Sequence, residues 1–180
     1  MVKSTSILVI GIGPDLVTLS AADFSAYSLY YPNCRLETVE YVPELLELVS
    51  AGFDIVHVLC RISTEGVIVD KEATITSGSN LLDRAYRHGS KVLFIAGENS
   101  KEAYINGIKL GERKINLVMT LNRHGGDFAA FLKKLLARMA AGEPMVRAWA
   151  AIAPQIRGAS EANLPDCIFA AGLPNAVFLP

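Results

Sequence analysis

Four mostly apolar segments, the first of them continuous, constrain the fold of this chain more than any other feature. They lie at residues 7–13, 53–60, 91–97 and 114–121 (ILVIGIG, FDIVHVLC, KVLFIAG and KINLVMTL). A strand with one solvent-facing side alternates apolar and polar residues, whereas an unbroken apolar run is typical of a strand covered on both faces. The sequence therefore predicts a central sheet that is buried between two layers of helices.

Helical patterns separate these runs. The apolar side chains of residues 128–139 recur at i, i+3, i+4, i+7, i+8 and i+11, which is the spacing of one face of an amphipathic helix. Pro43 and Gly52 mark the beginning and end of an earlier helix, and Pro144 begins a last one. Strands that alternate with helices predict an α/β fold, a three-layer sandwich around a mostly parallel central sheet.

Shorter segments complete the expected order of elements. Residues 35–42 alternate more and are expected to form a strand nearer an edge of the sheet. Residues 80–88 predict a helix that Ser79 or Asn80 caps and Gly89 ends. The remaining expectations are a hairpin at residues 66–70 and 74–76, a short helix within residues 101–111, and two final strands at residues 166–171 and 176–179.

Length and composition narrow the class of protein. With 180 residues, the chain has the usual size of one folding unit, so we expect a single domain over residues 1–180. Hydrophobic residues make up 51% and charged residues 19%, which excludes intrinsic disorder. The formal net charge of -1 provides no field for nucleic acid or an anionic membrane, and it favours a homo-oligomer or a protein partner.

The three cysteines indicate a reducing compartment. Cys34, Cys60 and Cys167 form no close pair, and no cysteine or histidine cluster has zinc-ligand spacing. Two of them lie in apolar runs, where a thiol behaves as a small hydrophobic side chain. We therefore expect a cytoplasmic protein that has no metal site and no cofactor.

Polar residues follow the predicted strands and mark the expected binding crevice. In a parallel sheet, the loops at the carboxyl ends of the strands meet at one edge and form the usual ligand site. The candidate ligand- or partner-binding residues at these ends are Asp15, Arg61, Glu98, Asn99, Ser100, Arg123 and His124.

The first of these loops, the GIGPD segment, has two interpretations. A dinucleotide-binding turn requires a third glycine three residues after Gly13, but Leu16 stands there, and Pro14 removes a backbone donor that a phosphate would use. A tight turn is therefore favoured over a nucleotide site.

The histidines differ in what they can do. His57 lies inside an apolar run, which favours a hydrogen-bonded core residue over a catalytic base. His88 ends a predicted helix, where an imidazolium interacts well with the helix dipole. His124 lies in a loop at the productive end of the sheet and is the histidine best placed for chemistry.

From residue 53 onward, the order of elements resembles a CHAT domain, which has the caspase-like (clan CD) peptidase fold. That family has a strand with a His-x-x-x-His-Gly pattern, a hairpin and helix, and a strand ending in a Ser-Ala-Cys type motif. This chain has His57 followed by VLCRI, the hairpin GVIVDKEATIT, and FIAGE at the place of the cysteine motif. MTLN, the paired helices FAAFLKKLLARMAAGEPMVRAW and the terminal CIFAAG match the rest of the order.

The catalytic positions depart from that family. Its general-base histidine falls on Arg61 and its nucleophilic cysteine on Gly97, while Ile62 replaces the glycine after the histidine. A cysteine peptidase needs a thiolate and a nearby imidazole, and a guanidinium keeps its protons at any working pH. The resemblance thus implies a caspase-like domain without catalytic residues.

Arg61 then has two possible roles. It could form a bidentate pair with Glu98 from the neighbouring strand, which would fill the former active site. Alternatively, Arg61, Arg123 and His124 could bind an anionic group of a ligand or partner. The pair with Glu98 is favoured.

Three functions remain after these arguments. The preferred one is a non-catalytic caspase-like domain, a pseudo-peptidase that acts as a protein-interaction or regulatory module. A hydrolase that uses other residues, such as His124 with Asp127 or Cys60, is an alternative. A small-molecule or nucleotide-binding α/β domain is the other alternative, with Asp15, Arg61, Ser100 and Arg123 around the crevice.

Overall fold

A six-stranded sheet forms the centre of the protein in a computed structural model, which describes residues 4–97, 102–103, 107–122, 127–157 and 166–180. The strands of this sheet are β1 (Ile7–Ile12), β2 (Cys34–Val39), β3 (Ile55–Leu59), β6 (Val92–Ala96), β7 (Asn116–Asn122) and β8 (Asp166–Ala171). Their order is β2-β1-β3-β6-β7-β8. The first five run parallel, and only β8 is antiparallel to its neighbour β7. The predicted mostly parallel sheet is confirmed, and β1 shows that the first fifty residues belong to it.

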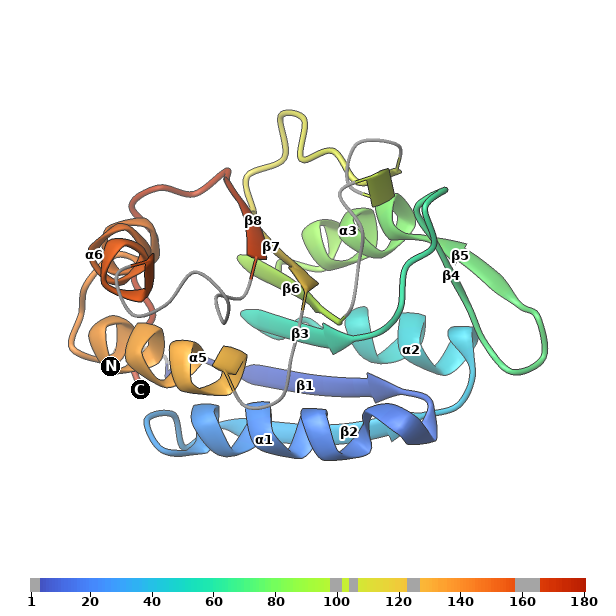
Figure 1. Cartoon of the computed structure of the whole chain (residues 1–180), viewed down its shortest axis with the longest axis horizontal. Coiled ribbons are helices and arrows are strands. Elements are labelled where there is room, and N and C mark those ends of the chain that lie inside the picture. Colours follow the sequence, from blue (N-terminus) through green and yellow to red (C-terminus); the bar gives the residue numbers. More distant parts are fainter. Residues whose placement is uncertain (1–3, 98–101, 104–106, 123–126, 158–165) are drawn as a thin grey trace.

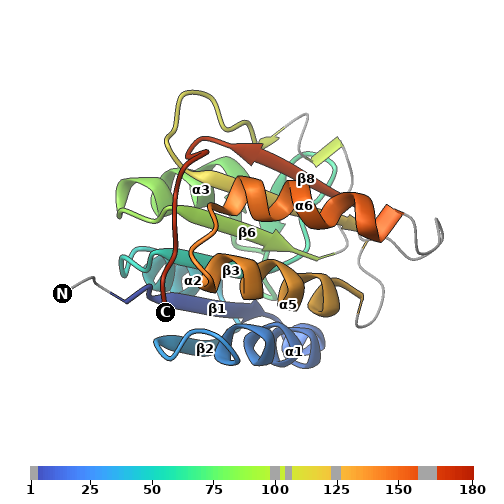
Figure 2. The same cartoon turned by 90° about the vertical axis from the view of Figure 1, so that its left-hand side faces the viewer.

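Helices cover both faces of the sheet (Figure 1). Figure 2 shows α5 (Asp127–Ala140) and α6 (Met145–Arg157) in front of the sheet, with α2 (Val42–Val49) and α3 (Gly78–Arg87) behind it. Helix α1 (Val17–Ser28) packs beside α5. This arrangement confirms the three-layer α/β sandwich. No helix in the described part of the chain is long and apolar enough to cross a membrane.

The alternation of side chains along the strands builds two cores. Leu8 and Ile10 face the α2–α3 layer, while Ile7 and Val9 face the α1–α5–α6 layer. Every residue of β1, β3 and β6 is buried, which explains why these strands are apolar throughout except for His57 in β3. Each large aliphatic side chain buried in this way stabilises the fold by roughly 1.5–3 kcal/mol.

A short hairpin stands outside the main sheet. β4 (Val67–Val69) pairs antiparallel with β5 (Ile75–Ser77), which confirms the predicted hairpin. In Figure 1 it projects from the right-hand side of the molecule, beyond the carboxyl end of β3. The cap of the following helix differs from the prediction, because the Ser77 hydroxyl accepts the Asn80 backbone N–H at 3.0 Å and α3 therefore begins earlier.

Two segments differ from the sequence-based expectation. No helix was predicted at residues 17–28, because the buried side of α1 carries Ser20 and Asp23 and so shows no amphipathic pattern. The strand predicted at residues 176–179 is wrong. The carbonyl groups of this segment accept hydrogen bonds from three separate places (Thr5 N, Met145 N and the Tyr31 hydroxyl) instead of forming a ladder with one strand.

Candidate functional site

A pocket of about 320 Å³ lies at the carboxyl ends of β1 and β3, beside the hairpin. β1 lies between β2 and β3, and the chain leaves β1 toward one face of the sheet and β3 toward the other. A crevice at such a reversal of strand order is the usual binding position in open α/β sheets. The pocket is lined by Ile12, Gly13, Pro14, Asp15, Leu16, Glu40, Arg61, Ile68, Val69, Asp70 and Lys71.

The turn after β1 positions the first polar side chain of this pocket. Gly13 has φ +98°, a conformation that glycine adopts without strain, and its N–H donates to Val39 O at 3.0 Å. A short 3₁₀ helix, η1 (Pro14–Leu16), follows immediately and leads into α1. The chain turns tightly here, and the turn holds Asp15 at the pocket rim.

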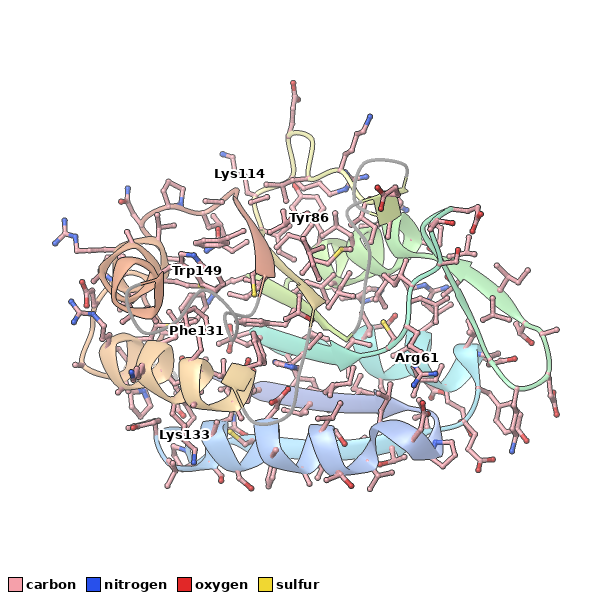
Figure 3. All side chains as sticks on the ribbon, viewed as in Figure 1. Arg61, Tyr86, Lys114, Phe131, Lys133 and Trp149 are labelled. Atoms are coloured by element: carbon pink, nitrogen blue, oxygen red, sulfur yellow. The ribbon has the colours of Figure 1, made fainter. Side chains whose placement is uncertain are left out.

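Arg61 and Asp15 come together across the pocket. Arg61 Nη2 lies 2.8 Å from Asp15 Oδ2, so the loop after β3 is joined to the loop after β1. Figure 3 shows Arg61 at the end of β3, close to the base of the hairpin. The carboxylate that Arg61 contacts is thus Asp15, whereas the predicted partner Glu98 lies outside the described residues.

The hairpin supplies the opposite wall of the pocket. The Asp70 carboxylate accepts the backbone N–H groups of Val42, Glu72 and Thr74, each at 2.9 Å. These donors, Val42 foremost, hold the pKa of Asp70 below its usual value, so the group is ionised at neutral pH. Lys71 forms an ion pair with Glu40, and its Nζ lies 4.6 Å from the centre of the Tyr41 ring.

The last two described residues at the end of β6, Ala96 and Gly97, carry no reactive side chain. Gly97 donates its N–H to Thr120 Oγ1 at 2.7 Å, and the same hydroxyl donates to the Gly97 carbonyl at 2.7 Å. Thr120 lies on β7 and is buried. The position that the resemblance assigns to a nucleophile is therefore a glycine whose backbone is held by the neighbouring strand.

His57 belongs to a buried polar network, as its position in an apolar run predicted. Its Nδ1 lies 2.9 Å from the Tyr27 hydroxyl and its Nε2 lies 2.9 Å from Asp23 Oδ2, and all three residues are fully buried. The imidazole stacks on Phe94 with ring centres 5.0 Å apart. Burial, together with the nearby Asp23 carboxylate, raises the pKa of Tyr27 well above its usual value. Sequence reasoning missed Asp23 and Tyr27, because both lie on the helix that it did not predict.

The thiols of Cys34 and Cys60 are poorly suited to catalysis. Burial raises the pKa of Cys60 to about 12 and that of Cys34 to about 11. Cys60 also packs in the α2–α3 core, on the opposite face of β3 from His57. Neither thiol is thus a ready thiolate, and Cys60 does not meet His57.

Five of the predicted site residues lie outside the described part of the chain: Glu98, Asn99, Ser100, Arg123 and His124. Asp15 and Arg61 are the two that the structure brings together. His88, expected near a helix end, is the C-cap residue of α3. Among the described residues, no group of three or more His, Cys, Asp or Glu side chains is placed to hold a metal ion.

Comparison with known proteins identifies the fold. No protein-family model matches the sequence, and no curated protein is significantly similar to it. Among solved structures, caspase-1 from Spodoptera frugiperda matches with a TM-score of 0.58 at 11% sequence identity, over 98% of this chain and 88% of that chain. A structure of pro-sf-caspase-1 matches with a TM-score of 0.59 at 11% identity, over 95% of this chain and 88% of that one. At this identity the likeness shows the fold alone, and that fold is caspase-like.

Proposed function

We propose that this chain is a non-catalytic caspase-like domain that acts through contacts with other protein chains. One observation carries the proposal. At the two strand ends where the resemblance to CHAT domains places the general base and the nucleophile, the chain has Arg61 and Gly97, and both are held by internal contacts. Arg61 is paired with Asp15, and Gly97 is bonded to Thr120.

The chemistry of these two positions opposes peptide hydrolysis. A guanidinium has no lone pair with which to take a proton, so Arg61 does not act as a general base. Gly97 offers no nucleophile, and no cysteine in the described residues stands at the end of β6. Cys60 is adjacent to Arg61 in sequence, but its buried thiol remains protonated at neutral pH. With free thiols and no disulfide, the cytoplasm remains the compartment we expect.

A hydrolysis assay tests the proposal that the domain is not catalytic. The full chain is incubated with a mixture of fluorogenic peptides that carry each of the amino acids before the scissile bond. We expect no release of fluorophore above the buffer rate. Release that disappears in the His124→Ala variant, while the circular dichroism spectrum is unchanged, would overturn the proposal and favour a hydrolase with other catalytic residues.

The edge of the main sheet supports the part of the proposal that concerns contacts with other protein chains. β8 is the last strand of the sheet, and its side chains from Cys167 to Ala170 are all partly exposed and apolar. In the sheet that the described residues form, no strand pairs with β8 on the side away from β7, and β8 has neither of the residues, lysine and proline, that natural monomers often place on such an edge. We therefore propose that β8 is where the chain pairs with a second copy of itself.

Oligomeric mass tests this interaction directly. Native mass spectrometry of the purified chain, at several protein concentrations, should show an oligomer whose mass is a defined multiple of the chain mass. The fraction of protein in this oligomer should grow with concentration. A bare monomer at every concentration, with no protein retained from host lysate, would contradict the interaction module.

A further inference from the structure

The outer face of the hairpin is apolar and has no partner among the described residues. Val69 and Ile75 are directly opposite each other across β4 and β5, and they are 52% and 62% exposed. Their neighbours Ile68 and Thr76 point the other way and are buried. The hairpin is therefore anchored on its inner face, while one aliphatic cross-strand pair faces solvent.

This exposed pair continues into the pocket at the ends of β1 and β3. Val69 belongs to both, since it pairs with Ile75 and also lines the pocket together with Asp15 and Arg61. We call the combined surface, made of Val69, Ile75 and the pocket, the docking face. It places an apolar surface next to a charged pocket. An extended peptide segment can contact both with two neighbouring side chains, one apolar and one charged.

The charge of the docking face favours a basic occupant. Three carboxylates line the pocket, and the two cations there, Arg61 and Lys71, are each already paired with one of them. Lys71 is held further by the Tyr41 ring. The third carboxylate, Asp70, is held by backbone N–H groups and keeps its negative charge. The pocket therefore has more negative than positive charge.

Arg61 is the contact that an incoming cation would replace. Its side chain is 68% exposed, the Asp15 side chain is 50% exposed, and the contact between them is the 2.8 Å from Arg61 Nη2 to Asp15 Oδ2. Exposed ion pairs contribute little to stability, so separating Arg61 from Asp15 requires little free energy. An anionic guest would instead have to draw both Arg61 and Lys71 away from their carboxylates.

We propose that the docking face binds an extended segment of a partner protein that presents an arginine or lysine beside an aliphatic residue. The basic side chain enters the pocket and pairs with Asp15 in place of Arg61, and the aliphatic side chain packs on Val69 and Ile75. This inference rests on the proposal that the chain is an interaction module, and it names the chemistry of one partner of that module.

Selection of peptides by the full chain tests the inference. A phage-displayed library of random peptides is selected on the immobilised wild-type chain. Peptides that also bind the double variant Asp15→Asn, Ile75→Ser are discarded. We expect the recovered sequences to be enriched in Arg or Lys next to Ile, Val or Leu. Recovery without such enrichment, or with enrichment in Asp or Glu, would overturn the inference.

Four single variants then test the geometry with one recovered peptide, labelled with fluorescein and followed by fluorescence anisotropy. Asp15→Asn should weaken binding about tenfold, because the charged acceptor is lost. Arg61→Ala should tighten binding about two- to fivefold, because the competing cation is removed. Ile75→Ser should weaken binding roughly threefold through lost apolar contact. Leu29→Ser, at an equally exposed residue (62%) at the end of α1, should change nothing.

The sign of the Arg61→Ala effect is decisive. If this variant weakens binding, Arg61 itself holds the ligand, the ligand is anionic, and the inference is wrong. The oligomeric mass measurement involves β8 and not the docking face. A failure of the peptide selection is therefore distinguishable from a failure of the proposed function.

Discussion

At the scale of single residues, the least expected feature is the contact of Asp23, Tyr27 and His57 inside the core. Three polar side chains are fully buried, and each one finds a hydrogen-bonding or charged partner at 2.9 Å. A buried polar group without a partner is costly, so such a contact holds helix α1 in one orientation against strand β3. It does so where α1 lacks the aliphatic stripe that usually positions a helix.

A Tyr27→Phe variant measures this contribution. The change removes only the hydroxyl that lies 2.9 Å from His57 Nδ1 and leaves the ring in place. We expect the free energy of unfolding to fall by about 1–3 kcal/mol, because a buried ring nitrogen loses its partner. Urea denaturation followed by circular dichroism gives the value.

Tyr30→Phe serves as the matched control, since Tyr30 lies on the same turn of chain but is only partly buried. That variant should stay within about 0.5 kcal/mol of the wild type. Equal stability of the two variants would mean that the Tyr27 hydroxyl contributes nothing.

At the scale of elements, β8 is the strand whose surroundings matter most. It is the only antiparallel strand of the main sheet, and it forms one of the two edges. Trp149 of α6 contacts Phe169 of β8 and Phe131 of α5, each with ring centres 4.8 Å apart, which supports the strand from one face (Figure 3 labels Trp149 and Phe131). Among the strands of the described residues, none pairs with β8 on the side away from β7.

An Ala171→Pro variant tests that edge. The Gly172 N–H donates to Ile115 O on the β7 side, so alternation directs the Ala171 N–H away from the sheet. Proline removes that outward donor without breaking the bonds to β7. We expect Ala171→Pro to shift the oligomer toward monomer by at least about fivefold in dissociation constant, since one intermolecular hydrogen bond is lost.

Light scattering after size-exclusion chromatography reads out this shift, and Ala171→Ser, which keeps the donor, is the control. If the proline and serine variants associate as strongly as the wild type, pairing through β8 is wrong. The emission of Trp149, the single tryptophan, reports whether the strand remains packed on α6 in each variant.

At the scale of the whole molecule, four groups in the described part of the chain that release protons at high pH are buried in a core or half-buried against one. Burial raises the pKa of Cys60 to about 12 and of Cys34 to about 11, and it also raises the pKa values of Tyr27 and Tyr31. In the unfolded chain the thiols titrate near 9.0. Above that pH the unfolded state holds fewer protons than the folded state, so stability is lost as pH rises.

Stability measured from about pH 8 to about pH 11 should therefore be level at first and then fall. Each group adds a slope of about 1.4 kcal/mol per pH unit once its unfolded form has ionised. A Cys60→Ala variant should be less stable at pH 8 but fall more gently above pH 9, because one of the four groups is gone. Parallel curves for the two proteins would show that the Cys60 thiol ionises as easily in the folded state as in the unfolded one.

Local sequence pattern was enough for most elements. The all-buried strands β1, β3 and β6 could be predicted because both of their faces contact cores, which favours apolar residues at nearly every position. Helix α5 could be predicted because one of its faces contacts the sheet. Helix α1 could not, because Ser20 and Asp23 occupy its buried side and obtain partners that no local pattern reveals.

For the candidate site, too, the sequence determined one part and the tertiary structure the other. The sequence by itself determined which residues follow each strand, and hence that Asp15 and Arg61 lie at the productive edge of a parallel sheet. The resemblance to CHAT domains, which was also argued from sequence, predicts that Arg61 and Gly97 stand where a cysteine peptidase would need a histidine and a cysteine, and this stays a prediction.

Only the tertiary structure decided which of these residues meet. Arg61 pairs with Asp15, 46 positions earlier in the chain by their residue numbers, because β3 lies directly beside β1 in the sheet. The hairpin adds Val69 and Lys71 to the same pocket. Sequence pattern reports the environment of each residue one element at a time, whereas a pocket between strands depends on strand order, and strand order is set by the packing of the whole molecule.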